Sequence, residues 1–253
     1  LYLPINVYAG HLQGWGMLDL VQQVLFEGTF YHLWYLPAAI LGAWLTAFLM
    51  RKCSRGTCFA VVGVLYILGL LGDSYWGLIS GVPVVSSVYN AIFAVMGYTR
   101  NGLFFAPMFM LLGASLKDVK PRSTAADALG LALSFALMLA EALLARVHGW
   151  QRHDSMYVML PVVMYFLFAL LARYKGTVRL PLGNFSLLVY IIPPAVIIVV
   201  RGAARVLGLW DIFVENSLGH YIAVCLCSAA ASAVLLWIWS FIKPQKVSYT
   251  SRA

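Results

Sequence analysis

The sequence carries little charge for its length. Only 10% of its 253 residues are Asp, Glu, Lys or Arg, whereas a soluble domain carries about 25%. Apolar residues make up 62% of the chain, and its mean hydropathy is +0.87. Because so large an apolar surplus must face something other than water, the composition excludes an ordinary soluble domain. It favours an all-α polytopic membrane protein.

Motifs for several other functions are also missing. The four cysteines and five histidines form no set with metal-ligand spacing, so no metal site is predicted. There is no glycine-rich phosphate loop, no His-x-x-x-His pair on a helix and no nucleophile elbow. The net charge of +8 comes from basic residues that stand between apolar runs and not along one face. Nucleic acid is therefore not expected as a partner, and the lipid bilayer is.

Seven apolar runs are long enough to cross that bilayer, since a spanning helix needs about 20 residues. The shorter run at 83–97 is expected to form a re-entrant or interfacial helix, and residues 1–9 resemble the outer end of a further helix. Pro193 and Pro194 lie inside the sixth run, where they kink or break it. The seven runs are 32–50, 58–72, 101–116, 125–147, 155–173, 184–200 and 218–242.

The basic loop residues orient these runs. If the seven runs alternate across the membrane, 12 of the 17 Lys and Arg residues fall on one side, which the positive-inside rule makes the cytoplasm. The C-terminus then lies on that side. We expect residues 1–242 to form a transmembrane domain that is incomplete at its N-terminus. Residues 243–253 are expected to link it to a further cytoplasmic domain.

Polar and ionisable residues gather at the outer ends of the runs. Such groups usually face a bundle interior or a water-filled cavity. Both signs of charge are present, which suits a small zwitterion, with Arg100 on its carboxylate and Asp73 or Asp154 on its ammonium. The candidate substrate-binding residues are His32, Asp73, Arg100, Asn101, Glu141, His153, Asp154 and Ser155.

A structural explanation competes with this hypothesis. Residues at the ends of spans lie near headgroups and water, where a charge costs little. His32 stands between Tyr31 and Trp34, as in an ordinary aromatic belt at a membrane interface. Glu141 lies deeper in its run, so for this residue we expect a function or a buried ion pair.

Four segments carry a resemblance to a known family: GTFYHLWYLPAAILG, LGLLGDSYWGLI, YTRNGLFFAPMFMLLGA and HDSMYVMLPVVMYFLF. Together they resemble the membrane half of the membrane-bound serine/alanine racemases of vancomycin-resistance clusters. That half belongs to the acyltransferase-3 superfamily. The likeness runs through nearly the whole chain, in order. It implies a bundle of ten transmembrane helices, of which this chain would hold about seven full helices and part of an eighth.

The resemblance carries over to few residues. In the superfamily, the proposed catalytic histidine and its partner arginine lie on a first helix that this chain does not include, so the catalytic residues here are unknown. His32 in HLW and Arg100 in TRNG match family positions near the site, and carry over as site-lining residues only. Pyridoxal phosphate would belong to a racemase domain beyond residue 253, so no cofactor is expected within this chain.

Three functions stay open from this resemblance, all in a bacterial plasma membrane. In the first, the domain supplies L-serine to the protein's own cytoplasmic racemase domain, for peptidoglycan precursors that end in D-serine and confer vancomycin resistance. In the second, the domain is an enzyme that moves an acyl group from an inner donor to an acceptor outside. In the third, it only anchors the racemase at the membrane.

Overall fold

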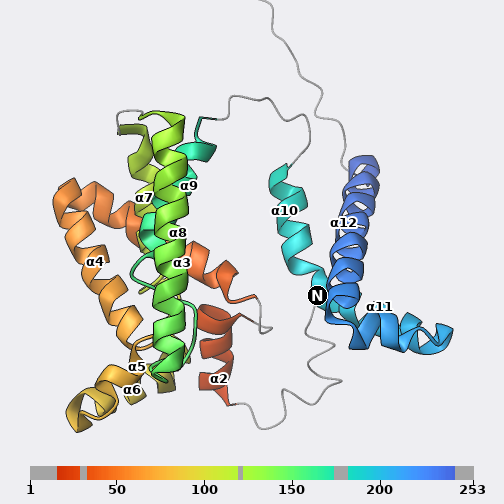
Figure 1. Cartoon of the computed structure of the whole chain (residues 1–253), viewed down its shortest axis with the longest axis horizontal. Coiled ribbons are helices and arrows are strands. Elements are labelled where there is room, and N and C mark those ends of the chain that lie inside the picture. The colour runs from red at the N-terminus through yellow and green to blue at the C-terminus, as the bar shows by residue number, and fades with distance from the viewer. Residues whose placement is uncertain (1–15, 29–32, 119–121, 174–181, 243–253) are drawn as a thin grey trace, which may run out of the picture. The chain divides into compact units, whose positions relative to one another are not determined.

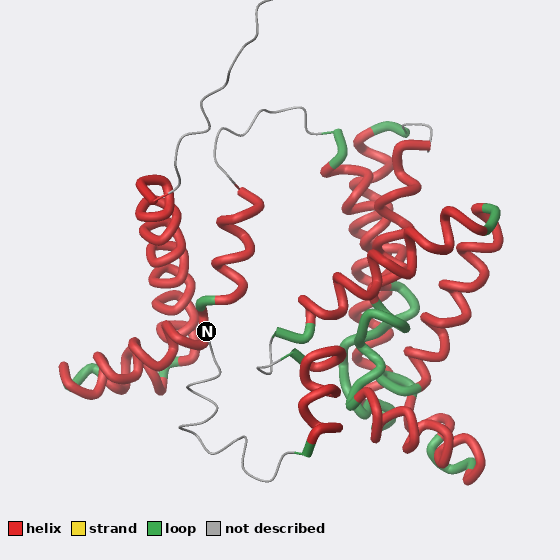
Figure 2. The backbone as a smooth tube through the Cα atoms, turned by 180° about the vertical axis from the view of Figure 1, so that it is seen from behind, coloured by secondary structure: helices red, strands yellow, loops and turns green. Residues whose placement is uncertain are grey.

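The computed structural model describes residues 16–28, 33–118, 122–173 and 182–242 (Figure 1). All regular structure in these residues is helical, as the sequence predicts, and the tube in Figure 2 shows only helices and loops there. The chain divides into two compact units, 1–175 and 176–253. His32, the helix end expected at 1–9 and the linker at 243–253 lie outside the described residues.

The described part of the first unit contains eight α-helices. Five of them lie on the apolar runs expected before residue 174, and the run at 83–97 is also helical; the short helices at 17–22 and 76–79 were not predicted. A π-helical segment, η1 (Gln23–Glu27), follows the first of them, and a 3-10 turn, η2 (Leu116–Asp118), follows the sixth. The eight helices are α2 (Met17–Gln22), α3 (Tyr35–Lys52), α4 (Arg55–Leu71), α5 (Trp76–Ile79), α6 (Pro83–Met96), α7 (Ala106–Ser115), α8 (Thr124–Val147) and α9 (Leu160–Leu171).

Local sequence signals explain where these helices begin and end. Ser54 caps α4, because its Oγ accepts a hydrogen bond from the backbone N–H of Thr57 at 3.2 Å. Ser123 caps α8 in the same way through Ala126 N–H at 3.1 Å. α6 ends at Gly97, whose φ of +68° favours glycine. Any Cβ at Gly97 would also collide with the side chain of Glu27.

α8 and α9 pack against each other along their length (Figure 1). They run antiparallel, because Asp127 near the start of α8 contacts Arg173 just after α9, and Glu141 near the end of α8 contacts Met159 just before it. α7 packs on α3, α4 and α9, which links this pair to the rest of the unit.

The second unit contains α10 (Leu182–Ile191), α11 (Pro193–Leu207) and α12 (Ser217–Ile242), with a π-helical turn, η3 (Asp211–Glu215), before α12. α10 and α11 meet at a bend of 52°. The bend falls at Pro193 and Pro194, as the sequence predicts, since proline has no N–H to continue the helical ladder. Both α10 and α11 pack on α12.

Two described helices, α8 and α12, are long and apolar enough to cross a membrane, and the bent pair α10–α11 is a third if it forms one span. Four other apolar helices, α4, α6, α7 and α9, have 10 to 17 residues. Apolar side chains such as Leu129, Leu133 and Val147 stand exposed along α8, as expected for contact with lipid. The apolar, helical character is confirmed, whereas the count of seven full spans stays a prediction.

Candidate functional site

Three loops of the first unit meet and hold most of the candidate residues. They are the turn at 72–75 after α4, the segment 97–105 before α7, and the segment 148–159 between α8 and α9 (green in Figure 2). Asp73 lies on the first loop, Arg100 on the second and Ser155 on the third. Hydrogen bonds join Asp73 to Ser155, and Ser155 to Arg100. We call this arrangement the loop junction.

Asp73 fastens the first loop to the third. Its side chain is fully buried, and its Oδ1 accepts hydrogen bonds from the backbone N–H groups of Ser155 at 2.8 Å and Met156 at 2.9 Å, and from Ser74 Oγ at 3.0 Å. Its Oδ2 is also buried and accepts no hydrogen bond from the described residues. Burial raises the pKa of Asp73, and the three hydrogen bonds oppose that rise.

Arg100 is held between two aromatic rings. Its Nη1 donates to Ser155 Oγ at 3.2 Å. The centre of its guanidinium lies 4.8 Å from the ring centroid of Tyr98 and 5.3 Å from that of Trp34, which are cation–π distances. The half-buried side chain is therefore kept in one place by a hydrogen bond and two aromatic rings.

His153 lies on the third loop, beside Tyr98. Its ring centroid is 4.6 Å from that of Tyr98. Burial lowers the pKa of His153, and the positive charges of Arg152 and Arg100 lower it further, whereas Asp73 raises it. The ring is therefore mainly neutral at pH 7.

Two further candidates have different surroundings. Asn101 is buried and shapes its own loop: its Nδ2 donates to Tyr98 O at 2.9 Å, and its Oδ1 accepts from the N–H groups of Leu103 and Phe104. Asp154 is exposed and has no hydrogen bond or ion pair with the part of the chain that the structure describes.

Glu141 extends from α8 to two loops of the loop junction, at Tyr75 and just before the start of α9. Its Oε1 accepts from Tyr75 Oη and Val158 N–H, each at 2.5 Å, and its Oε2 accepts from Met159 N–H at 2.9 Å. These partners are neutral donors and not the cation of an ion pair. Glu141 therefore caps α9 from the neighbouring helix.

An apolar cavity of about 360 Å³ lies next to the loop junction. Trp34 belongs to its wall and also carries the guanidinium of Arg100 on its ring. The rest of the wall comes from α3, α7, α9 and Phe105 just before α7, and it is apolar or aromatic. The other residues of the wall are Tyr35, Ala38, Phe105, Ala106, Phe109, Met110, Leu160, Met164 and Phe168.

Comparison with known proteins establishes the family. The acyltransferase domain of the acyltransferase-3 family matches residues 1–237. The chain belongs to the acyltransferase-3 family. No solved structure matches it.

Curated relatives of this acyltransferase-3 chain bear racemase names, which confirms the resemblance seen in the sequence. It is 38% identical to an amino-acid racemase of Enterococcus faecalis, over 99% of this chain and 36% of that protein. It is 36% identical to a serine/alanine racemase of Enterococcus gallinarum, over 89% of this chain and 32% of that protein. The chain thus spans about a third of the length of the curated relatives it matches.

The structure brings together part of the set of candidates chosen from the acyltransferase-3 sequence. Asp73, Arg100, His153 and Ser155 meet at the loop junction, and Asn101 shapes one of its loops. The two rings that hold Arg100 were not among the predicted site residues. Their signal was available, because Tyr98 stands two residues before Arg100 and Trp34 stands in the HLW element.

Proposed function

We propose that this acyltransferase-3 domain supplies L-serine to a pyridoxal-phosphate racemase domain on the cytoplasmic side of a bacterial plasma membrane. The product, D-serine, would end peptidoglycan precursors, as in vancomycin resistance. The names of the relatives support an amino-acid substrate. The observation that carries the proposal is the loop junction, where a guanidinium and a buried carboxylate are linked through Ser155. In this proposal pyridoxal phosphate belongs to the racemase domain, and no residue of this chain is assigned to it.

The junction has groups for both ends of an amino acid. A guanidinium presents a planar fork of N–H donors that matches a carboxylate, and Trp34 and Tyr98 hold that of Arg100 in place. Oδ2 of Asp73 is buried and accepts nothing from the described residues. An ammonium group would give this oxygen a donor and favour the ionised carboxylate.

The test follows radiolabelled L-serine into proteoliposomes that contain the full-length gene product. Arg100→Ala should lower the rate of uptake about tenfold or more, because a lost charge-assisted hydrogen bond costs about 1.5 to 3 kcal/mol. Racemisation in detergent should not change. Arg146→Ala is the matched control, since Arg146 is an exposed arginine at the end of α8. Uptake that is the same for Arg100→Ala and wild type would contradict the proposal.

A second function, acyl transfer across the membrane, is favoured by the apolar cavity. Its apolar wall suits an acyl chain, and Trp34 connects it to the loop junction. A neutral histidine such as His153 is also the form that a general base requires. The same proteoliposomes separate the two functions. Transfer of label from an acyl thioester to an acceptor, without serine uptake, would support the acyltransferase. If neither activity is detected, the membrane anchor is the remaining function.

A further inference from the structure

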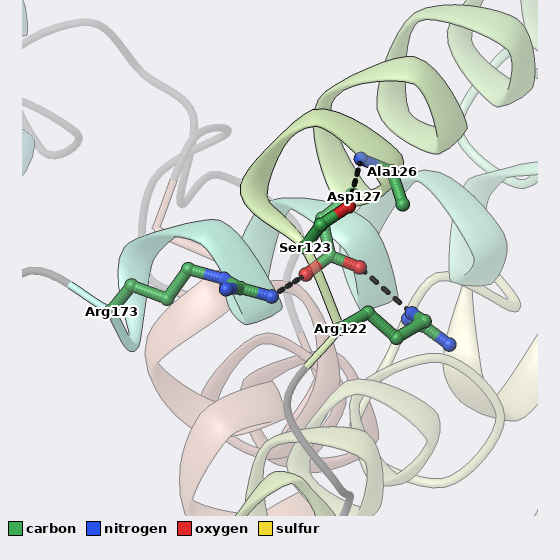
Figure 3. A network of polar contacts seen from close by, with 5 residues as sticks. All are labelled: Arg122, Ser123, Ala126, Asp127 and Arg173. Atoms are coloured by element: carbon green, nitrogen blue, oxygen red, sulfur yellow. Dashed lines mark hydrogen bonds and ion pairs between the residues drawn. The ribbon is translucent and has the colours of Figure 1, made fainter.

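A second cluster of charges lies at the opposite end of the α8–α9 pair from the contact between Glu141 and Met159, and Figure 3 draws its residues. Asp127, in the first turn of α8, is only 1% exposed. One of its oxygens accepts from Arg122 Nε at 2.9 Å and the other from Arg173 Nη2. Figure 3 shows the carboxylate between the two guanidinium groups, below the Ser123 cap of α8 in this view.

The cluster carries a net charge of one positive unit. Two guanidinium groups share one carboxylate, so a single positive charge is left over. Nε of Arg173 is buried, and no acceptor among the described residues reaches it. A buried N–H donor of a charged group without an acceptor costs more than a hydrogen bond returns, which makes this atom an unexplained feature of a purely structural cluster.

The surrounding sequence offers no further acid to satisfy this surplus. Asp118 is the nearest acid before Arg122, and it already pairs with Arg55 at 2.9 Å. Apart from Asp118, the segments on either side of the two arginines add only basic residues and no Asp or Glu. Those basic residues are Lys117, Lys120, Lys175 and Arg179. An anion from outside the chain is therefore the partner that this end of the helix pair lacks.

We propose that Arg122 and Arg173 form a binding site for a phosphate group, with Asp127 orienting both side chains. Phosphate fits better than a single carboxylate, because it offers oxygens to two guanidinium groups at once and carries more than one acceptor toward each. The rings of Tyr165 and Phe166, whose centroids lie 5.1 and 5.3 Å from the Arg122 guanidinium, keep that group from turning away. The site is independent of the serine proposal.

Such a phosphate has two possible sources, a lipid headgroup in the bilayer or a soluble phosphate compound. Two measurements on the purified chain distinguish them. The first titrates radiolabelled pyrophosphate into protein in a neutral detergent. The second compares thermal unfolding in phosphatidylcholine nanodiscs with and without phosphatidylglycerol.

The test variant is Arg173→Lys, which keeps the charge beside Asp127 but removes Nε and the planar fork. Arg122→Lys is the second variant, for the case that Arg173→Lys does not fold. Lys52→Gln is the control, because it removes one exposed positive charge from the end of α3 and does not touch the cluster. Either arginine variant should weaken the phosphate response about tenfold, and the control should leave it unchanged.

Saturable pyrophosphate binding that depends on the arginines would support a soluble ligand. An arginine-dependent rise of the unfolding midpoint with phosphatidylglycerol, without pyrophosphate binding, would support a lipid headgroup. A response that is equal in wild type and arginine variants, or absent from both measurements, would overturn the proposal and leave a structural clamp. Neither result changes the expectation for serine uptake, so the two proposals fail separately.

Discussion

A carboxylate lies at each end of the α8–α9 pair, and one has charged partners whereas the other has neutral partners. At one end Asp127 lies between two arginines. At the other end Glu141 accepts hydrogen bonds from a tyrosine hydroxyl and from two backbone N–H groups at the start of α9. Both acids come from the same apolar helix, so charge within a span has two different explanations in one molecule.

The difference shows how an acid is accommodated at depth. A helix N-terminus has N–H groups without partners and the positive end of the helix dipole, so it stabilises Glu141 without any cation. Asp127 is stabilised by two arginines instead. Their cluster keeps a net positive charge, for which we proposed an anion as the partner. A carboxylate in an apolar helix is thus weak evidence for a substrate site until its partners are known.

The largest effect is expected for Asp127→Asn. The substitution leaves two guanidinium groups without their carboxylate, and breaking a buried ion pair is strongly destabilising. Because the arginine side chains are 43% and 29% exposed, we expect part of that effect, a fall of about 6 to 10 °C in the midpoint of thermal unfolding. Circular dichroism in detergent would measure it. A fall of only a degree or two would mean that the cluster behaves like surface charges.

An intermediate effect is expected for Glu141→Gln. The amide keeps the shape of the side chain but turns an NH₂ group toward one of its N–H donors, so at least one hydrogen bond is lost. The midpoint should fall by about 3 to 6 °C. Tyr75→Phe is the matched comparison, since it removes one donor and keeps the acid, and it should cost less. An equal or larger cost for Tyr75→Phe would contradict the capping role.

The smallest effect is expected for Arg55→Gln. Arg55 and Asp118 form an ion pair at 2.9 Å, but their side chains are 48% and 50% exposed. Solvent screening leaves exposed pairs with little net energy, so the midpoint should fall by less than about 2 °C. The effect should also vanish in concentrated salt. A cost close to that of Asp127→Asn would show that burial does not separate the two ion pairs.

Much of the fold follows from the sequence, because apolar runs and capping residues are local signals. The break at Pro193, the serine caps and the helix at 125–147 all correspond to such signals. The lengths of α7 and α9 do not follow from local signals, because both helices are shorter than the apolar runs that predict them. Asn101 and Ser155 lie in apolar stretches that look spanning, yet both residues belong to loops. Asn101 is held by local hydrogen bonds. Ser155 depends on contacts with Asp73 and Arg100, which are more than fifty positions away.

The charged residues of the candidate site could be predicted from the sequence, but the partners that they contact could not. Arg100 and Asp73 stand out as ionisable residues near span ends, and the structure places both at the loop junction. Depth alone suggested a function or an ion pair for Glu141, but its partners come from Tyr75 and the α9 start, 66 and 17 residues away. From the sequence Arg122 and Arg173 are only basic loop residues, since nothing local shows that Asp127 joins them.

Equilibrium binding of radiolabelled L-serine to the purified protein tests the central claim, that the loop junction is an amino-acid site. The account predicts saturable binding that Arg100→Ala abolishes, that Asp73→Asn weakens, and that Arg146→Ala leaves intact. Absence of saturable serine binding to folded wild-type protein, or binding that Arg100→Ala does not weaken, would contradict it.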